Sequence, residues 1–566
     1  MTPDSTDNDS VSGGQLLAEC LVLNNAQLGF GVPGESYLAV LDAMVDIQER
    51  FELMVTRNEG GAAYMAAAYG ALTGKPGLCF VTRGPGATNA SVGVHSAAQN
   101  SAPMILFVGQ VGRSMSGREA FQEIDYQAFY GSVAKWVVQI EEAARIPELI
   151  SRAFTVATTG RAGPVVVALP EDVLTEMTSA RACIACKPEL PQANQHSIAQ
   201  MVDLLRDAKK PLVIAGGRDW HGESLEALHS FIESSNIPVV TSFRFNDLFD
   251  NHSPCYAGNA GVGMHAPLQK LITDADVVLA LGVRFGEIST LGYTLFTPPV
   301  AKQKIVHVHV SDAELGKVYV PELAVHASPG EVARQLTEQS IEGDWQAWCQ
   351  AARQQFLDSL NCPAQPGDVD MGVISAHLRD VLPDDVIVTN GAGNFTAWPN
   401  RFLTYGRSAR LLAPQNGTMG FGLPAAIAAK KLLPSRTVVC FAGDGDFQMN
   451  CQELGSAMQY DALPIVLIVN NGSYGTIRMH QEANYPERPS ATDIVNPDYV
   501  ALGQAYGMHA EVITQTNEFA AAFERASNSP TGALLDIRVN IESLTPARSL
   551  SDIRNTALAN QAADSG

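Results

Sequence analysis

Short runs of apolar residues recur along the whole chain and constrain its fold more than any other feature. They are rich in Val, Ile and Leu and alternate little with polar residues: 78–82, 104–109, 164–170, 211–217, 237–241, 276–282, 304–310, 385–391, 437–443, 464–471 and 533–539. Strands that are buried on both faces of a parallel sheet have this composition. Helical stretches such as 60–74 and 517–528 lie between the runs. Alternation of strand and helix over the full length predicts an α/β protein with parallel sheets.

The apolar runs fall into three groups, because two polar, proline-containing segments interrupt the pattern at 181–195 and at about 336–370. A chain of 566 residues is too long for one ordinary core, so several domains are expected. We therefore predict three doubly wound parallel-sheet domains with a C-terminal tail: 12–180, 196–335, 371–545 and the tail 546–566.

Composition narrows the class of partner. The formal net charge of −22 repels nucleic acid and anionic membranes, and no apolar run reaches the ~18 residues of a membrane-spanning helix. The N-terminal stretch 1–14 is acidic and polar, which predicts a flexible tail rather than a targeting signal. The nine cysteines are scattered, and the CxxC at Cys183 and Cys186 lacks a second pair, so ordinary thiols are expected there. We predict a cytoplasmic protein without nucleic-acid or membrane partners.

Glycine-rich turns follow several of the predicted strands, and ligands of open parallel sheets bind at those strand ends. The turns are 82–89, 215–222, 390–398 and 442–447. In the last one Asp444 follows a buried strand, and Asn471 closes the next strand along the chain. If the two strands are neighbours, a carboxylate and an amide oxygen converge, with the carbonyl of Ser473 as a third oxygen. Such a set suits Mg²⁺, whereas the alternative is an Asx turn at a strand end.

The segment "GDGDFQMNCQELGSAMQYDALPIVLIVNN", residues 443–471, resembles the diphosphate-binding motif of thiamine diphosphate (ThDP) enzymes. Other segments are similar to the acetolactate synthase branch of that family: 30–44, 57–89, 103–111, 120–125, 163–172, 279–285 and 417–429. The resemblance covers nearly the whole chain. It implies a pyrimidine-binding domain, a central domain and a diphosphate-binding domain, in the order of the three predicted domains.

The resemblance also implies a role for individual residues. Those matching cofactor contacts are Pro33, Gly34, Glu59, Gly391, Ala392, Gly393, Asn394, Gly417, Met419, Gly443, Asp444, Gly445, Asp446, Asn471, Ser473, Tyr474 and Gly475. Asp444, Asn471 and the Ser473 carbonyl match the family's Mg²⁺ ligands. Glu59 matches the glutamate that contacts N1′ of the aminopyrimidine held by the partner subunit, and otherwise reads as a helix-start glutamate.

Two further positions complete the implied cofactor site. Gly417 matches the carbonyl that receives the 4′-amino group, and Met419 matches the bulky residue that bends the cofactor. A buried methionine otherwise fills gaps in a core. Because Glu59 and Asp444 would serve one cofactor from opposite subunits, a homodimer is the expected minimum and a homotetramer is compatible.

The implied activity is ThDP- and Mg²⁺-dependent decarboxylation of pyruvate or a related 2-oxo acid, followed by carboligation as in acetolactate synthase. Three alternatives remain open at this stage. They are a 2-oxo acid decarboxylase or carboligase with a different acceptor, a ThDP-flavin oxidase, and a non-catalytic nucleotide-binding regulator. The stretch 215–222 could be a dinucleotide turn. However, residues around 258–266 match the family's FAD-contacting stretch poorly, so we do not expect tightly bound FAD.

The sequence departs from the biosynthetic branch at the implied substrate pocket, which Phe121 and Gln122 are expected to line. His480 stands where a tryptophan is usual, so it could bind a polar acceptor, transfer a proton or fill space. Gly286-Glu287-Ile288 replaces an Asp-Asp-Arg pattern that receives the second substrate's carboxylate. Arg83 replaces a serine before the 84–89 turn and could bind a substrate anion or pair with a neighbouring acid. The donor half of the chemistry is therefore retained, and the acceptor half is altered.

Overall fold

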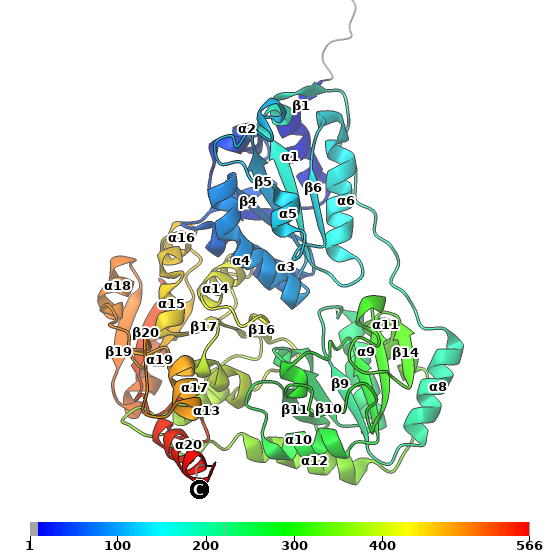
Figure 1. Ribbon diagram of the computed structural model, residues 1–566, viewed down its shortest axis with the longest axis vertical. Helices are drawn as coiled ribbons and strands as arrows, with labels where there is room; N and C mark the ends of the chain where they lie inside the picture. Colours follow the sequence, from blue (N-terminus) through cyan, green and yellow to red (C-terminus); the bar gives the residue numbers. More distant parts are fainter. Residues whose placement is uncertain (1–9, 221, 565–566) are drawn as a thin grey trace, which may run out of the picture. The chain divides into compact units, whose positions relative to one another are not determined.

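The structure is a computed structural model that describes residues 10–220 and 222–564 (Figure 1). Residues 1–9 of the predicted N-terminal tail lie outside the described part. The tail prediction is wrong for the residues that follow, because β1 (Val11–Ser12) and the start of α1 (Gly13–Leu23) are ordered. Ser12 caps this helix, since its hydroxyl accepts a hydrogen bond from Gln15 N and the Gln15 side chain accepts one from Ser12 N.

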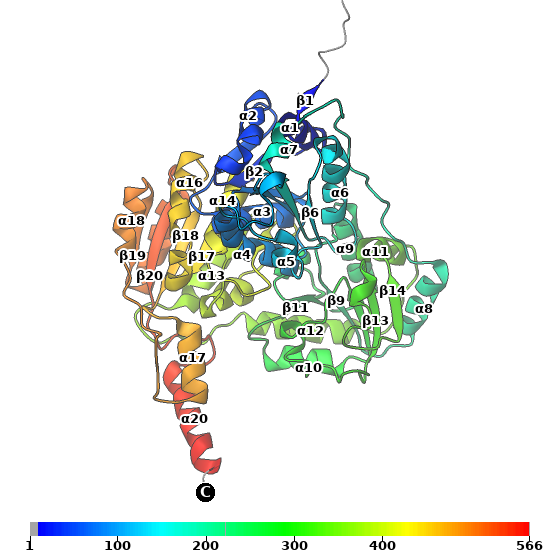
Figure 2. The same ribbon diagram turned by 45° about the horizontal axis from the view of Figure 1, so that its top comes forward.

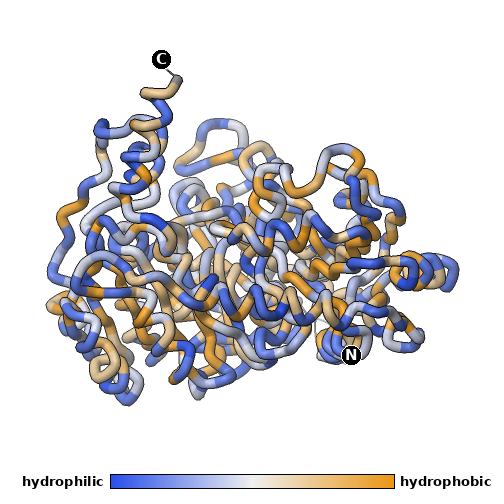
Figure 3. Tube along the Cα trace, turned by 90° about the horizontal axis from the view of Figure 1, so that it is seen from below, coloured by the Kyte–Doolittle hydropathy of each residue, from blue (hydrophilic) through white to orange (hydrophobic). Residues whose placement is uncertain are grey.

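The predicted α/β fold with three parallel sheets is confirmed. Each of the apolar runs named above contains a strand, and each of three sheets has six strands that pair only in parallel. Burial on both faces explains the unbroken apolar sequence, as in β5 (Met104–Gln110), where all seven residues are buried. Figure 3 shows hydrophobic segments running through the interior of the trace, with hydrophilic segments mostly at its margin.

The first sheet has the strand order β3-β2-β4-β5-β7-β6. Its other strands are β2 (Leu28–Gly31), β3 (Glu52–Val55), β4 (Gly77–Val81), β6 (Trp136–Gln139) and β7 (Pro164–Pro170). Its other helices are α2 (Leu38–Asp46), α3 (Glu59–Thr73), α4 (Gly84–Asn100), α5 (Tyr126–Tyr130), α6 (Ile146–Thr158) and α7 (Glu171–Thr175). The short strand β8 (Met177–Thr178) pairs antiparallel with β1.

The central sheet has the order β11-β10-β9-β12-β13-β14, the 3-2-1-4-5-6 pattern of dinucleotide-binding folds. Its strands are β9 (Pro211–Ala215), β10 (Val239–Ser242), β11 (Tyr256–Ala260), β12 (Val277–Leu281), β13 (Lys304–His309) and β14 (Leu323–His326). Its helices are α8 (Gln195–Arg206), α9 (Glu223–Ser235), α10 (Ala266–Asp274), α11 (Pro329–Thr337) and α12 (Gln346–Ser359). Helix α12 lies within the expected separator 336–370, and its Cys349 and Phe356 belong to the core of this sheet.

The third sheet has the order β16-β15-β17-β18-β20-β19. Its strands are β15 (Ile387–Asn390), β16 (Arg410–Leu412), β17 (Val438–Gly443), β18 (Ile465–Asn470), β19 (His509–Ile513) and β20 (Ala533–Arg538). Its helices are α13 (Met371–Val381), α14 (Gly422–Leu432), α15 (Asp444–Gln448), α16 (Leu454–Gln459), α17 (Gly475–Asn484), α18 (Tyr499–Ala505), α19 (Phe519–Ser527) and α20 (Leu550–Asp564). Helix α20 occupies the expected tail and packs against α17 (Figure 2).

The chain divides into two compact units. The first unit holds the first sheet together with Ile427–Pro434 and Asn450–Ala462. The second unit holds the central and third sheets. Two segments of the predicted third domain therefore belong to the first unit, and the domain bounds given above stay a prediction.

Candidate active site

The loops that follow the strands of the third sheet enclose a cavity of about 230 Å³. Thirteen of the residues predicted to contact cofactor line it: Ala392, Gly393, Asn394, Gly417, Met419, Gly443, Asp444, Gly445, Asp446, Asn471, Ser473, Tyr474 and Gly475. Gly391 immediately precedes this set. The structure thus brings together segments that lie up to 83 residues apart (475 − 392) at one edge of one sheet.

Asp444 lies at this edge because β17 and β18 are neighbours, as the sequence argument required. Its side chain is buried, and Oδ2 accepts hydrogen bonds from Gly472 N at 2.9 Å and from Asn496 Nδ2 at 2.7 Å. Burial raises the pKa of this carboxyl, and the hydrogen bonds oppose the shift. One carboxylate oxygen is thus fixed by protein donors.

Asn471 and Ser473 present the remaining oxygens. Asn471 Oδ1 accepts a hydrogen bond from Ser473 N at 3.0 Å, which is the Asx turn named above as the alternative reading. The Ser473 carbonyl accepts from Gly475 N at 2.8 Å. Each oxygen keeps a second lone pair, so the turn shapes the loop without excluding a metal.

This donor set fits Mg²⁺, since it consists of one carboxylate, one amide and one carbonyl oxygen. Among residues 10–220 and 222–564 there is no group of three or more His, Cys, Asp or Glu side chains that could hold a metal ion. A cation at this edge would therefore need oxygens from a ligand to complete its shell. Gly445 leaves no room for a side chain, because a Cβ there would lie 2.7 Å from the Tyr474 ring.

The Asp446 side chain points into the protein and holds the surrounding turns together. It is buried, and Oδ1 accepts hydrogen bonds from Gly420 N at 2.9 Å and Ala392 N at 3.1 Å. A Cβ on Gly391 would lie 2.0 Å from this oxygen, so the close approach requires glycine. Burial raises the pKa of Asp446 to about 7. From the central sheet, the buried Arg244 donates from Nη1 to Gly391 O at 3.1 Å.

Met419 lies between Gly417, which has a φ of +64°, and Gly420, which has a φ of +80°. Both values lie in the left-handed region that favours glycine. The first of these glycines has open space where a Cβ would stand, and the second binds the Asp446 carboxylate. The turn therefore presents Met419 to the cavity from a backbone that Asp446 fixes.

Glu59 is the first residue of α3 in the first unit. Asn58 caps the helix by accepting from Gly60 N at 2.8 Å, and Glu59 Oε2 accepts from Asn89 Nδ2 at 2.9 Å. The side chain is half-buried. Pro33 and Gly34 follow β2, and a Cβ on Gly34 would lie 2.5 Å from the Thr82 side chain, so this turn is tightly packed. The roles predicted for these residues stay predictions.

Glu453 holds the start of α3, and sequence reasoning missed it. It is fully buried and accepts hydrogen bonds from Asn58 N at 2.9 Å, from Arg57 N at 3.1 Å and from Ser456 Oγ at 2.6 Å. Burial raises the pKa of this carboxyl. In return, the Arg57 guanidinium donates to the Gly455 carbonyl at 3.1 Å. The segment between the GDG and NN motifs thus clamps the residues that precede Glu59.

The predicted substrate-pocket residues Phe121 and Gln122 lie in the loop before α5 in the first unit. Phe121 is 71% exposed, and Gln122 has a φ of +65°. Arg83 is buried and forms an ion pair with Glu171 at 2.5 Å, while Nη1 donates to the Phe121 carbonyl at 3.4 Å. Of the two readings offered for Arg83, the structure shows the pairing with a neighbouring acid.

His480 is exposed on α17 and is not among the residues that line the 230 Å³ cavity; Ile477 of the same helix lines it. On the same helix, the buried Glu482 pairs with Arg554 of α20 through two hydrogen bonds of 2.8 and 2.7 Å. Arg554 lowers the pKa of Glu482 to about 2. The residues 286–288 are also exposed.

Several lining or supporting residues gave no signal in the sequence. Asn496 donates to Asp444 and to Asn470, Tyr499 donates to the Asp444 carbonyl at 3.1 Å, and Thr476 exchanges hydrogen bonds with Asn394. Each lies in an ordinary polar loop or helix, so only the folded chain reveals it.

The glycine turn that follows β9 in the central sheet contains a buried aromatic side chain. Trp220 is buried, and its Nε1 donates to the Gly216 carbonyl at 2.7 Å. Across the described ranges 10–220 and 222–564, none of the helices is long and apolar enough to span a bilayer.

Comparison with known proteins gives consistent matches over the chain. Residues 11–129, 198–336 and 391–537 match the N-terminal TPP binding domain, the central domain and the C-terminal TPP binding domain of thiamine pyrophosphate enzymes. The chain is 32% identical to the acetolactate synthase large subunit of Parasynechococcus marenigrum, covering 95% of this chain and 89% of that protein. It is 29% identical to acetolactate synthase isozyme 2 large subunit of Escherichia coli, covering 95% and 97%. It is 30% identical to the mitochondrial acetolactate synthase catalytic subunit of Saccharomyces cerevisiae, covering 94% and 81%.

Proposed function

This chain belongs to the thiamine pyrophosphate enzyme family, in its acetolactate synthase-like branch, and from that premise we propose a decarboxylating carboligase that depends on ThDP and Mg²⁺. Its donor is pyruvate or a close 2-oxo acid relative, and its product is an acetolactate-type adduct. The observation that carries the proposal is the cavity at the edge of the third sheet, where oxygens of Asp444, Asn471 and Ser473 converge beside three glycine-rich turns.

Each part of the site has a distinct task in this proposal. When bound, ThDP would supply a nucleophilic carbon for the 2-oxo acid and a sink for the electron pair released with CO₂. Asp444, Asn471 and the Ser473 carbonyl would hold Mg²⁺ and through it the diphosphate. Met419 would hold the cofactor in its bent shape, and the backbone N–H groups of the glycine turns would bind phosphate oxygens.

Glu59 is the proposed acid–base residue. Its carboxylate would hold a proton at N1′ of the aminopyrimidine, which makes the neighbouring amino nitrogen a base for the reacting carbon. The clamp of Glu453 on Arg57 and Asn58 fixes the backbone from which Glu59 projects. Precise placement of this carboxylate supports the proximity effect on which the reaction depends.

The exposed His480 and Glu287 favour a second candidate, a decarboxylase or carboligase with a different acceptor. Purified protein with ThDP, Mg²⁺ and pyruvate should release CO₂ and form acetolactate. Release of CO₂ with acetaldehyde alone would replace the first candidate by the second. Absence of CO₂ with pyruvate and with a panel of 2-oxo acids would reject both.

We propose a homodimer, which can pair further into a tetramer, in which Glu59 of one chain serves the cofactor bound at Asp444 of the other. Two inactive variants, Glu59→Gln and Asp444→Asn, test this when co-expressed. Half of randomly formed dimers are mixed, and each mixed dimer has one intact site of two, so about one quarter of the sites should be active. No recovery above the sum of the separate variants would contradict a shared site.

We propose that the enzyme works without tightly bound flavin, because the stretch 258–266 matches the family's flavin-contacting stretch poorly. The purified protein should show no flavin absorption in the visible range, and a yellow protein would favour a flavin enzyme. A cytoplasmic location is part of the proposal, supported by nine cysteines that are all free thiols.

A further inference from the structure

A second cavity, of about 310 Å³, lies in the second unit beside the cofactor cavity. One side comes from β11, α10 and α12 of the central sheet, and the other from residues 393–401 after β15 and from Met479 of α17. The two cavities share only Gly393, Asn394 and Leu544 among their lining residues. None of the described residues of the glycine turn 215–222 lines it, whereas Gly258, Asn259, Val262, Gly263 and His265 of the stretch 258–266 do.

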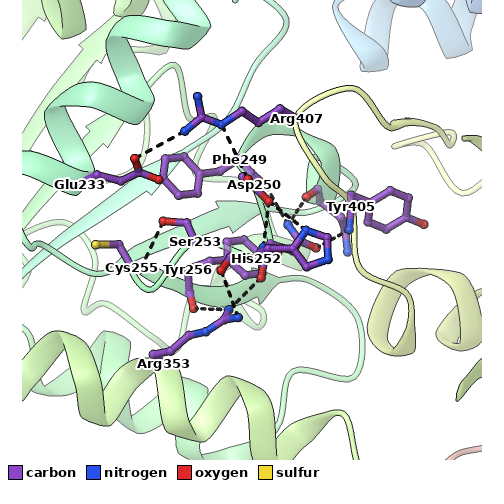
Figure 4. A network of polar contacts seen from close by, with 12 residues as sticks. Glu233, Phe249, Asp250, His252, Ser253, Cys255, Tyr256, Arg353, Tyr405 and Arg407 are labelled. Atoms are coloured by element: carbon purple, nitrogen blue, oxygen red, sulfur yellow. Dashed lines mark hydrogen bonds and ion pairs between the residues drawn. The ribbon is translucent and has the colours of Figure 1, made fainter. Parts of the chain in front are cut away.

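The two sides of this cavity are joined by direct hydrogen bonds, which makes it a built feature of the unit. Asn251 N donates to the Tyr405 carbonyl at 2.9 Å, and Asn251 Oδ1 accepts from Tyr405 N at 3.1 Å. Asn246 Nδ2 donates to the Asn400 carbonyl at 2.5 Å. Figure 4 shows the same junction, where Arg407 reaches Glu233 and Asp250 of the central part.

The lining combines apolar surface with one positive charge. Phe243, Tyr256 and Phe356 contribute aromatic rings. Arg401 is the sole Arg or Lys among the described lining residues, and no Asp or Glu is among them. A wall of this kind is suited to a ligand that is mostly apolar and carries one negative charge.

Arg401 lacks the partner that a half-buried guanidinium normally has. It forms no hydrogen bond or ion pair with any described residue, its Nε is buried, and its guanidinium carbon lies 5.2 Å from the centre of the adjacent Phe402 ring. Desolvation lowers the pKa of Arg401, yet the group stays charged at neutral pH. A cation taken from water without an anion is costly, so an anionic ligand would relieve this cost.

His265 adds a donor to the same lining. Its Nδ1 accepts a hydrogen bond from Leu268 N at 3.3 Å, which places the proton of the neutral ring on Nε2. Burial lowers the pKa of His265 to about 4, and Arg401 adds to the shift, so the ring is neutral at pH 7. The lining thus offers one charged and one neutral donor to an anion.

We propose that this cavity binds a small organic monocarboxylate, with its carboxylate on Arg401 and its apolar part against Tyr256 and Phe356. The planar fork of arginine matches a carboxylate, and a single cation matches a single negative charge better than it matches a phosphate dianion. The site is separate from the cofactor and does not depend on the proposed reaction.

The test uses 3-phenylpropanoate, which has no oxo group to react with ThDP. Calorimetric titration of the full chain with saturating ThDP and Mg²⁺ should detect its binding, and 3-phenylpropanamide should bind at least about 10-fold more weakly. Arg401→Met should weaken 3-phenylpropanoate about 10-fold or more, and Arg401→Lys should weaken it less. Lys270→Gln is the matched control, because Lys270 is 74% exposed on α10 and outside the lining.

Thermal unfolding gives a second, independent readout. Arg401→Met removes an unpaired charge, so the variant should fold and should melt no lower than the wild type. Added 3-phenylpropanoate should raise the Tm of the wild type and of Lys270→Gln, but not that of Arg401→Met. Equal affinity for acid and amide, equal affinity in Arg401→Met, inorganic phosphate binding more tightly than the acid, or no binding by the wild type would each overturn the proposal.

Discussion

The first and third sheets have the same strand order, whereas the central sheet does not. Numbered within each sheet along the chain, the strands of the first and third follow 2-1-3-4-6-5, and those of the central sheet follow 3-2-1-4-5-6. Equivalent strands of the first and third sheets therefore present their ends at equivalent places. The residues at those ends differ, so the same strand order carries different side chains in the two sheets.

The third strand of each sheet shows the contrast most clearly. In the third sheet it ends in Gly443 and Asp444, which lies in the 230 Å³ cavity. In the first sheet the equivalent strand, β4, is followed by Arg83, whose charge is used in the ion pair with Glu171. The first sheet instead carries Glu59, the carboxylate proposed to act in catalysis, after its second strand, β3. One topology thus supports two sets of loops with different residues at the strand ends.

The largest expected effect belongs to the first sheet. Glu59→Gln removes the carboxylate that is proposed to hold the N1′ proton, so proton exchange at the reacting carbon of ThDP should slow about 10²–10⁴-fold. ThDP affinity should change far less, because the diphosphate is proposed to bind at the third sheet. Exchange is started by transfer into D₂O, stopped by rapid quenching and followed by NMR. Unchanged exchange would remove Glu59 from acid–base catalysis.

A variant of the third sheet should instead weaken the binding of ThDP. Asp444→Asn keeps the size of the side chain but removes the charge on the proposed metal ligand, so ThDP affinity with Mg²⁺ should fall at least about 100-fold. Asp42→Asn, on α2, serves as a control for net charge and should leave affinity unchanged. If ThDP binds equally well to Asp444→Asn, the metal site is elsewhere.

Asp446 of the third sheet makes the free energy of unfolding depend on pH. Its folded pKa is about 7, above the ~3.9 of an unfolded aspartate, so the folded chain retains a proton that the unfolded chain loses across this window. The contribution of Asp446 to the free energy of unfolding is therefore fully present below about pH 4 and is lost as pH rises toward 7. Asp446→Asn cannot ionise, so its free energy of unfolding relative to wild type should rise by about 1.4 kcal/mol per pH unit there.

Urea unfolding of the ThDP- and Mg²⁺-free proteins at several pH values measures this difference. A difference that stays constant from about pH 4 to 7 would show that Asp446 is ionised in the folded chain throughout.

The smallest expected effect concerns the clamp on α3. Glu453→Gln replaces a carboxylate that accepts three donors, so it should destabilise the start of α3 and slow proton exchange on ThDP about 10-fold. Glu52→Gln is the matched control, because Glu52 pairs with Lys431 between the same parts of the first unit but is 43% exposed. Glu52→Gln should lower the free energy of unfolding by less than about 0.5 kcal/mol and leave proton exchange on ThDP unchanged. Equal effects of both variants would argue against a positioning role for Glu453.

The sequence predicted the inner strands and missed the edges. Every run that was identified became a strand, but all six edge strands, β3, β6, β11, β14, β16 and β19, lacked a recognised run. An edge strand is covered on fewer sides, so its sequence is less uniformly apolar; β14 has one buried residue of four. The inner strand β2 was also missed, because its four residues include two glycines.

The candidate site divides in the same way. Asp444 and Asn471 were predicted because the local motifs at two strand ends imply their meeting. Asn496, Glu453 and Arg244 were not, because each acts on a partner far away in sequence: Asn496 lies 52 residues from Asp444, and Glu453 lies 396 from Arg57. Asp446 was expected in the diphosphate segment, but its approach to Gly391 and the hydrogen bonds that it accepts from Ala392 N and Gly420 N are visible only in the folded chain.

The central claim is that the third sheet holds the diphosphate of ThDP through one divalent cation. Calorimetric titration of the purified protein with ThDP, in Mg²⁺ and again in excess EDTA, tests it most directly. The account predicts one ThDP per chain with Mg²⁺ and a large loss of affinity in EDTA, restored when Mg²⁺ is added back. Equal affinity in both buffers, or no ThDP binding at saturating Mg²⁺, would contradict it.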